Sequence, residues 1–346
     1  MVVFCTVALL FNIACSEDLI EVPPQQTDLD TTSHDFVWDQ TIIRSDEGNR
    51  GVFHDVCYIN DTCIWAVGWI VRYGQNNERE LYNACRWNGK EWSLERVFNE
   101  TPGFTKPDLN ELMVVYGDRP DNIWFSEGAV FVHWDGNRFS TDRSISDQMK
   151  GALRECWASG PDNIWMGGRD GELAHYNGKK WKRIPNEIAP EWHISGMFGH
   201  GDTVLLAATI HYTGTTAFYI ATNETVQFWR SDSLPQGVQA VWFDHLSDVW
   251  TDGAQSFQWD GYRWLNKHVP YAGYGEDISA NNRNDIMICG DVGTIRHWNG
   301  KNWRSWWKWP GIESARFWGI ELHENEAWVV GTLSEGGDLI IMHGKR

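Results

Sequence analysis

Two carboxylates and a few bases are the residues of this chain whose types could carry out a reaction. Glycoside hydrolysis needs two carboxylates about 5–10 Å apart across a cleft. Glu155 and Glu276 are the candidates for this pair. A lyase would need a base, such as His193 or Tyr274, together with a cationic clamp such as Arg154. These residues are far apart along the chain, so what they can do depends on the elements that position them.

Stronger chemical signatures are missing from the sequence. It contains no GxSxG, no phosphate-binding glycine-rich loop and no HExxH, and no Cys pair or Cys/His cluster has zinc spacing. The glycines of GRDG (168–171) and GDVG (290–293) are typical of hairpin turns. The formal net charge of −18 repels phosphate backbones and argues against a nucleic-acid partner. We therefore expect no metal and no cofactor, and we assign no catalytic residue.

A repeat accounts for most of the 23 Trp residues. DNIW occurs at 121–124 and again at 162–165. Variants of this motif are DTCIW at 61–65, SDVW at 247–250, NDIM at 284–287 and NEAW at 325–328. Most copies precede an aromatic residue, an Asn-Gly or Asp-Gly pair and a second aromatic residue, at 87–92, 134–139, 176–181, 259–264 and 298–303. Trp at repeated positions indicates core packing.

Each copy of the repeat predicts a sheet of four antiparallel strands. Asn-Gly or Asp-Gly between two short β-prone runs predicts a type I′ hairpin, in which both turn residues have positive φ. A second hairpin lies upstream, for example where 152–158 turns through Gly-Pro-Asp into 164–167. One such sheet cannot bury both faces, but copies stacked around an axis can, with Trp side chains between neighbours. The repeat therefore predicts a β-propeller.

The number of units and the way in which the ring closes also follow from the sequence. The first-motif anchors lie at 65, 124, 165, 205, 250, 287 and 328, with 197–229 as a degenerate fourth unit and insertions at 69–84 and 100–108. The last unit ends at 343–346, where the others continue into a fourth strand, and 36–43 has the strand character that it lacks. We predict an all-β, seven-bladed propeller of four-stranded antiparallel blades over 35–346. An N-terminal strand that completes the last blade would close it and remove two open sheet edges.

An Asp-x-x-Trp strand followed by an aromatic-Asn/Asp-Gly-x-x-Trp hairpin resembles the Trp-rich β-propeller repeats of bacterial secreted proteins and surface lipoproteins. The resemblance covers 36–346 and implies the fold, but it implies little about activity. The Ser-x-Asp-x-Gly-x-Thr-Trp turn of the sialidase propellers does not occur. Sialidase catalysis is therefore not carried over to this chain.

The N-terminal segment indicates export. Residues 1–15 form an apolar run that is too short to span a bilayer and that suits a signal peptide. Ala14 and Cys15 resemble the end of a lipobox, which predicts lipidation of Cys15, although Asn12 departs from the usual Leu. A polar tether at 16–34 follows, and it begins with Ser-Glu-Asp. We expect an outer-membrane or cell-surface lipoprotein that meets the membrane only through its lipid anchor; the alternative is a periplasmic or secreted protein.

Five cysteines follow Cys15, namely Cys57, Cys63, Cys85, Cys156 and Cys289. This odd number leaves at least one thiol unpaired. Cys57 and Cys63 flank a predicted hairpin turn, so an oxidising compartment could join them. The alternative is that all five are small, buried strand residues.

Two sets of residues are candidates for ligand binding. Aromatic residues that depart from the repeat lie in loops that would surround one mouth of the propeller, where they could stack on sugar rings; they are Trp69, Trp192, Trp306, Trp307 and Trp309, with Phe104, Tyr271 and Tyr274. Polar residues near the starts of the innermost strands could orient a polar ligand; they are Asp55, Arg154, Glu155, His193, Glu276, Asp277 and Arg316. The alternatives are loop packing for the first set and a wet, inert channel lining for the second.

These observations favour a non-catalytic binding protein of the cell envelope, either a monomer or part of an envelope complex. Its ligand would be a glycan or another surface protein. The alternative is an extracellular enzyme, a hydrolase or lyase, that acts on polysaccharide at the central mouth. A structural scaffold without a small ligand is a third possibility.

Overall fold

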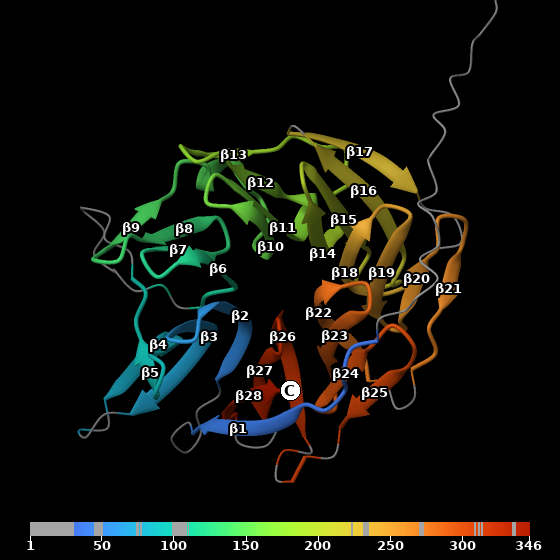
Figure 1. The fold of residues 1–346 in the computed structure, drawn as a ribbon. Helices are drawn as coiled ribbons and strands as arrows, with labels where there is room; N and C mark the ends of the chain where they lie inside the picture. Colours follow the sequence, from blue (N-terminus) through green and yellow to red (C-terminus); the bar gives the residue numbers. More distant parts are fainter. Residues whose placement is uncertain are drawn as a thin grey trace, which may run out of the picture.

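The computed structural model describes residues 31–44, 51–73, 76, 78–98, 109, 111–222, 224–230, 235–269, 273–307, 309, 310, 312, 314–333 and 337–346. These residues form seven antiparallel sheets of four strands each, arranged around one axis (Figure 1). The predicted fold class is confirmed. Residues 1–30, which include the predicted signal peptide, Cys15 and most of the tether, lie outside the described residues, as do Phe104 and Tyr271.

The strands follow one another blade by blade. The first three blades are β2 (Val52–Asn60), β3 (Cys63–Tyr73), β4 (Arg79–Trp87) and β5 (Trp92–Glu95); β6 (Val114–Arg119), β7 (Asn122–Glu127), β8 (Val130–Trp134) and β9 (Phe139–Asp142); and β10 (Leu153–Gly160), β11 (Asn163–Gly168), β12 (Leu173–Tyr176) and β13 (Trp181–Arg183). The next three are β14 (His193–His200), β15 (Thr203–Thr209), β16 (Thr216–Thr222) and β17 (Thr225–Arg230); β18 (Val238–His245), β19 (Asp248–Gly253), β20 (Phe257–Trp259) and β21 (Trp264–Asn266); and β22 (Gly275–Asn282), β23 (Asp285–Gly290), β24 (Thr294–Trp298) and β25 (Trp303–Trp306). The seventh holds β26 (Ala315–His323), β27 (Glu326–Leu333), β28 (Leu339–Lys345) and β1 (Val37–Ile43).

Helical structure in the described residues is limited to two short 3₁₀ turns, η1 (Ser146–Gln148) and η2 (Arg169–Gly171). No helix in these ranges has the length and apolar character needed to cross a membrane. The innermost strand of each blade is its first in sequence, so β2, β6, β10, β14, β18, β22 and β26 surround the axis (Figure 1). All seven sequence anchors fall in second strands, including the degenerate one at 205 in β15.

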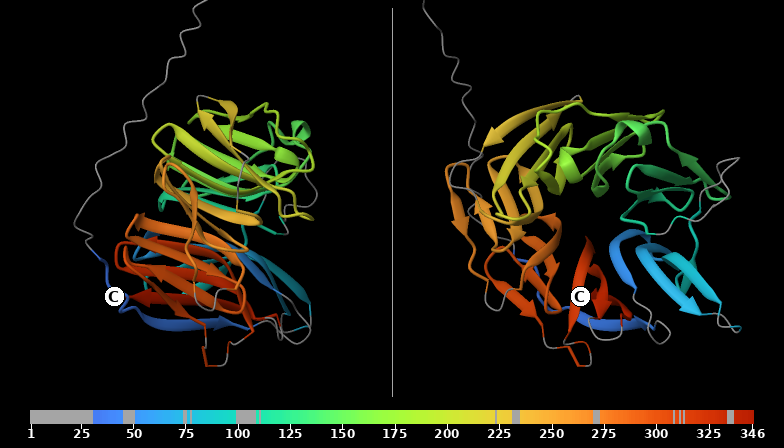
Figure 2. Two further views of the ribbon diagram at one scale, coloured as in Figure 1. Left: turned by 90° about the vertical axis from the view of Figure 1, so that its right-hand side faces the viewer. Right: turned by 180° about the vertical axis from the view of Figure 1, so that it is seen from behind.

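The N-terminal strand closes the ring, as the sequence predicts. β1 pairs antiparallel with β28 from Val37 opposite Lys345 to Ile43 opposite Leu339. Both views of Figure 2 show β1, in blue, lying along the red strands of the last blade. Phe36 is buried in the same apolar cluster as residues of the sixth and seventh blades, and Trp38 packs against that cluster. We call β1 the latch strand.

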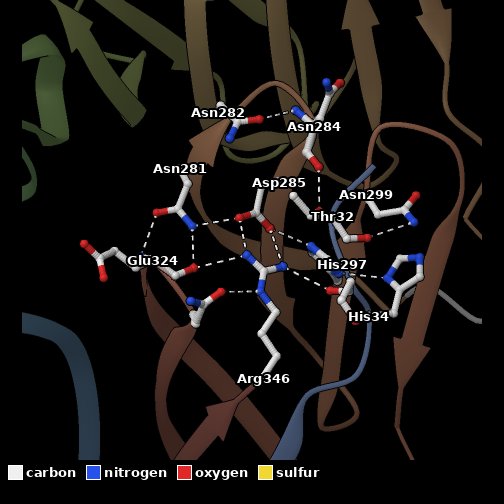
Figure 3. Close-up of polar contacts among 12 residues, drawn as sticks. Thr32, His34, Asn281, Asn282, Asn284, Asp285, His297, Asn299, Glu324 and Arg346 are labelled. Carbon is white, nitrogen blue, oxygen red and sulfur yellow. Dashed lines mark hydrogen bonds and ion pairs between the residues drawn. The ribbon is translucent and has the colours of Figure 1, made fainter. Parts of the chain in front are cut away.

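A polar clasp fixes Arg346 and the segment before the latch strand to the sixth blade (Figure 3). The guanidinium of Arg346 donates to both carboxylate oxygens of Asp285, at 2.9 and 2.5 Å. Asp285 also bonds the imidazole of His297 at 2.8 Å, and His297 in turn lies 2.8 Å from His34, ring nitrogen to ring nitrogen. Burial alone would raise the pKa of Asp285, but the hydrogen bonds from His297 and Arg346 lower it to about 2. The last residue of the chain and the segment before the latch strand are therefore both anchored to one carboxylate.

The Asn-Gly and Asp-Gly hairpins do not adopt the predicted type I′ turn. Trp87 pairs with Trp92, so the loop between them has four residues, and of these the glycine, Gly89, has positive φ (91°). The side chain of Asn88 instead accepts hydrogen bonds from the backbone N–H groups of Lys90 and Glu91. This side chain stabilises the turn without positive φ at Asn88, which a two-residue I′ loop would require at both of its residues. The same pair of bonds occurs at Asp135, Asn177, Asp260 and Asn299.

A polar pair inside most blades was missed by the sequence analysis. His133 of β8 bonds the amide of Asn122 at 2.6 Å while its ring lies 4.5 Å from that of Trp124. The sequence contains a signal for this pair, because the residue before the first aromatic residue of each Asn-Gly or Asp-Gly hairpin is often His or Gln. The equivalent bonds are His175–Asn163, Gln258–Asp248, His297–Asp285 and His343–Glu326. These bonds satisfy polar groups in an otherwise apolar interior and have a structural role.

All five described cysteines are free thiols, and they are Cys57, Cys63, Cys85, Cys156 and Cys289. The possible Cys57–Cys63 disulfide is therefore wrong for this structure. The Sγ atom of Cys57 lies 3.7 Å from the carbonyl oxygen of Gly117 in the next blade. Burial raises the pKa of the Cys57 thiol, which keeps it protonated and unreactive.

Candidate functional site

A β-bulge interrupts six of the seven innermost strands near the end where each strand begins. A bulge adds one residue to its strand, breaks the in-out alternation and re-aims the side chain at that point. The bulged residues are His54, Arg154, Ser195, Gln239, Glu276 and Trp318. They repeat around the axis at the same level of these six blades. We call them the bulge ring, and we call that end of the propeller the bulge face.

The bulge also explains why two adjacent polar residues both have a role. In a regular strand, either Arg154 or Glu155 could face the axis, but not both. The register shift between Leu153 and Glu155 removes that restriction. Arg154 is exposed, whereas Glu155 lies deeper and senses the charge of Asp277 across the axis.

One side of the bulge ring is a connected cluster of charged and aromatic side chains. Arg316 forms ion pairs with Glu276 and, at 2.7 Å, with Asp291, and its guanidinium lies 3.8 Å above the ring of Trp318. Across the seventh and first blades, the ring of His54 lies edge-on to that of Trp318 at 6.3 Å. These contacts join two of the candidate residues predicted from sequence to three that were not predicted.

Next to that cluster, the two blades before the seventh are joined by neutral hydrogen bonds. The hydroxyl of Tyr274 donates to the carbonyl oxygen of Gly237 at 2.9 Å and accepts from the amide of Gln239 at 3.1 Å. At the other end of that cluster, His54 bonds Glu111 at 2.6 Å. This bond lowers the pKa of Glu111, whose carboxylate therefore stays charged and held in place.

Two arginines of the bulge face are not paired in this way. Arg154 comes from β10 and Arg169 from the adjacent turn η2, and both are exposed. In the described part of the chain, neither guanidinium has a carboxylate within ion-pair distance. Beside them, His193 accepts a hydrogen bond from the backbone N–H of Asp170 at 3.1 Å. Among the candidate residues, Arg154 and His193 thus lie on one side of the ring and Glu276 and Arg316 on the other.

Below the bulge ring, carboxylates converge on the axis. Burial raises the pKa of Asp55 to about 7, of Asp277 to about 6 and of Glu321 to about 8. It also raises the pKa of Glu155 well above its usual range. The like charges of these groups raise one another's pKa further, with the exception of Asp277, for which burial acts against two backbone hydrogen bonds.

Two of these carboxylates connect neighbouring blades. Asp55 accepts the backbone N–H of Val115 in the second blade at 2.9 Å, and Asp277 accepts that of Ile320 in the seventh blade at 2.9 Å. Such bonds give Asp55 and Asp277 a structural role without any ligand. Within the same described ranges, no three His, Cys, Asp or Glu side chains are placed to hold a metal ion.

The raised pKa of Glu321 predicts the direction of its pH effect on stability. The charged form is disfavoured in the folded state, so the stability that protonation contributes is complete below the unfolded pKa of about 4.3. It is lost as the pH rises through about 8. We expect the Glu321→Gln variant to gain on the order of 3 kcal/mol relative to wild type between pH 5 and pH 9. Urea unfolding at a series of pH values measures this difference.

The exposed Glu91→Gln variant is the control for that measurement, because it makes the same change in net charge on the surface. It should follow the wild-type profile at every pH. A Glu321→Gln profile that runs parallel to wild type would show that the axial carboxylate is already charged in the folded protein near pH 7.

The aromatic candidates do not form a ring around the mouth. Trp306 and Trp309 pack against Trp38 of the latch strand, with ring centroids 5.7 and 5.8 Å away, and the indole N–H of Trp309 donates to Gly293 at 2.7 Å. Trp192 packs against the apolar cluster between the third and fourth blades. These three side chains are half-buried, and their packing is the alternative that the sequence left open.

The remaining two aromatic candidates contribute no platform either. Trp69 does not open a loop as predicted, because β3 continues to Tyr73 and Trp69 is paired with Val52 inside it. Trp307 is half-buried directly after β25. Ligand binding by these aromatic residues remains a prediction.

Comparison with known proteins identifies the fold and no family. No family model matches the chain, and no curated protein matches it. A solved structure described as YCF48 bound to D1 peptide is similar, with a TM-score of 0.63, 15% identity and coverage of 91% of this chain and 99% of that chain. The WD40 β-propeller domain of Doa1 has a TM-score of 0.61, 12% identity and coverage of 89% and 97%. YCF48 from Cyanidioschyzon merolae has a TM-score of 0.58, 14% identity and coverage of 88% and 98%. At these identities the likeness shows the propeller fold alone.

Proposed function

We propose that this chain is a non-catalytic binding protein of the cell envelope, and that it holds a protein partner on its bulge face. The observation that carries the proposal is the bulge ring itself. Six blades each break their strand pairing at one level and place His54, Arg154, Ser195, Gln239, Glu276 and Trp318 around the axis. A set of charged, amide, hydroxyl and aromatic groups on a rigid scaffold is suited to bind a polar chain. Display at the outer surface on Cys15 is part of the proposal.

Loops around the bulge ring add exposed side chains to the same face. The loop between β15 and β16 presents Tyr212, which is 96% exposed, beside the start of β14. Val292, in the loop between β23 and β24, is 61% exposed and has a φ of 56°. A β-branched residue in this left-handed conformation is strained, and such strain concentrates at binding sites and switches. Exposed apolar groups of this kind support contact with a protein surface.

The structure gives less support to a glycan ligand. Sugar rings bind by stacking on open aromatic faces, yet Trp306 and Trp309 are occupied by the latch strand. The indole of Trp318 has the guanidinium of Arg316 over one face, at 3.8 Å. A protein partner that combines charged and apolar side chains fits these groups better than a carbohydrate does.

A second candidate function is hydrolysis or lysis of polysaccharide, and one observation favours it. Burial raises the pKa of Glu155, which is the direction that a general acid requires. Its expected partner Glu276, however, is held by Arg316 in an ion pair. Release of reducing ends or of unsaturated products from a polysaccharide panel, abolished in a Glu155→Gln, Glu276→Gln double mutant, would establish this function in place of the first.

Truncation of the aromatic member of the bulge ring tests the proposed function. We expect Trp318→Ala to weaken retention of an envelope protein by about tenfold, because a central aromatic residue often carries much of the binding energy. Tyr262→Ala is the matched control, since Tyr262 is 75% exposed in the turn between β20 and β21, at the opposite end of the blades. The measurement is affinity enrichment from the envelope fraction, run in parallel with a glycan array.

Retention by wild type and by the Tyr262→Ala variant, with loss in Trp318→Ala, supports the proposal. Equal retention by all three proteins contradicts it. A glycan-array signal that Trp318→Ala abolishes would replace the protein partner by a carbohydrate.

A further inference from the structure

We propose that the bulge face recognises an acidic segment of its protein partner, and that Arg154 and Arg169 bind the carboxylates of that segment. This inference rests on the proposed function, because it names the chemistry of the ligand for the same face.

In the described residues, Arg154 and Arg169 differ from the nearby Arg183 and from Arg316 in having no internal carboxylate partner. The sequence has 47 acidic and 29 basic residues, so the protein as a whole is strongly acidic. Arg316, on the same face, pairs with two carboxylates, and Arg183 in the third blade pairs with Glu172 at 2.7 Å. Arg154 and Arg169 are exposed and, within the described ranges, have no such partner. Two cations left open at one place on an acidic protein favour an anionic ligand from outside.

The backbone holds Arg169 firmly beside β10. Its N–H donates to the carbonyl oxygen of Ala152 at 2.9 Å, which ties the turn η2 to the start of the innermost strand. Gly168 permits this approach, because a Cβ atom there would lie 2.1 Å from the same carbonyl oxygen. The next residue, Asp170, has a φ of 59° and donates its own N–H to His193. The guanidinium of Arg169 is therefore carried by a fixed turn and not by a free loop.

The carboxyl groups nearest to Arg154, which are Glu155 and Glu111, form no ion pair with it in the described residues. Partial burial, followed by the charge of Arg169, lowers the pKa of Arg154, so the two guanidinium groups repel each other in the free protein. Burial raises the pKa of Glu155, the carboxyl nearest to Arg154 in sequence, and in this described part of the chain Glu155 forms no ion pair with Arg154. Glu111 is charged but is bonded by His54 at 2.6 Å. A carboxylate from a partner would relieve the repulsion and could accept two parallel N–H bonds from either arginine.

Short labelled peptides test this recognition on the full chain. One peptide alternates Glu and Ala, the second alternates Gln and Ala, and both have blocked ends. We expect the Glu peptide to bind and the Gln peptide to bind at least tenfold more weakly, because an ionised acceptor roughly doubles the strength of each hydrogen bond. Fluorescence anisotropy measures both affinities. The affinity for the Glu peptide should also fall as the salt concentration rises.

The variant pair Arg154→Gln, Arg169→Gln should lower the affinity for the Glu peptide about tenfold or more. Arg138→Gln, Arg263→Gln is the matched control, because it removes the same charge from exposed turns at the opposite end of the blades. The control should bind within about twofold of wild type. All four arginines are exposed, so neither pair should change the urea midpoint.

Three results would overturn the inference. They are equal affinities for the Glu and Gln peptides, equal losses in the two variant pairs, and displacement of the Glu peptide by polygalacturonate at matched carboxylate concentration. Failure of the inference can be distinguished from failure of the proposed function. If the arginine pair variant still retains the envelope partner that Trp318→Ala loses, the face binds protein but does not recognise acidic groups.

Discussion

A chain that begins at residue 44 should lose most of its stability or become insoluble. Without the latch strand, β28 becomes an open edge along its whole length, from Leu339 to Lys345. The deletion also exposes the surface that Phe36, Trp38 and Ile42 cover in the apolar cluster of the last two blades. Each buried side chain of this size contributes about 1.5–3 kcal/mol. Their sum approaches the total stability of an ordinary domain, which is about 5–15 kcal/mol.

The matched control begins at residue 31 and keeps the latch strand and His34. Its urea midpoint should equal that of the longer chain. A synthetic peptide covering 31–44, added during refolding, should restore solubility to the shorter chain, because it can add as a strand to the open edge of β28. If the chain that begins at residue 44 is soluble and has the midpoint of the control, the latch strand does not stabilise the ring.

The second large effect is expected at a buried ion pair between the fifth and sixth blades. Arg296 of β24 has no exposed surface and donates to Asp252 of β19 at 3.0 Å. Asp252 also accepts the N–H of Gly253 at 2.8 Å and the hydroxyl of Ser256. Arg296→Ala should cost about 3–5 kcal/mol, because it leaves the Asp252 charge buried and without its cation. The shift of the urea unfolding midpoint gives this value.

A double variant tests whether the cost arises from the orphaned charge. Asp252→Asn, Arg296→Met removes both charges and keeps most of the volume, so it should be less destabilising than Arg296→Ala alone. If the double variant is less stable than Arg296→Ala, the loss of stability comes from packing and not from the unpaired charge. A cost below about 1 kcal/mol for Arg296→Ala would place the pair among exposed ion pairs, which contribute little.

The architecture could be predicted from the sequence because the same strand and turn pattern occurs seven times along the chain. The spacing of DNIW-like motifs places one anchor in the second strand of each blade, and even the degenerate copy at 205 holds its position. The latch strand could be predicted because the last unit lacks a strand that the segment at 36–43 supplies. The turn type was wrong because Asn-Gly permits more than one hairpin. The side chain of Asn88 satisfies the backbone itself, so positive φ is needed at Gly89 but not at Asn88.

The candidate site was only partly predictable, because the register of each innermost strand decides which residues meet. Arg154, Glu276 and Arg316 were selected as polar residues near strand starts, and the structure places all three at or beside the bulge ring. Trp318 lies in an innermost strand and was not selected as a candidate, because an aromatic residue there is expected to pack in the core. Consecutive polar residues, as in His54-Asp55, were the available signal of a bulge. In a regular strand two adjacent side chains point to opposite faces, so only one of them could face the axis. The contact of Trp306 with Trp38 of the latch strand joins segments that are far apart in the sequence, so no local pattern predicts it.

Photo-crosslinking from two exposed tyrosine positions is the most direct test of the central claim, that the bulge face is the binding face. A photoreactive phenylalanine derivative replaces either Tyr212, on the bulge face, or Tyr262, on the opposite face, in cells that make the protein. We predict one dominant adduct from position 212, lost when Trp318 is also changed to Ala, and none from position 262. The same adduct from both positions, or an adduct from position 262 alone, would contradict the claim.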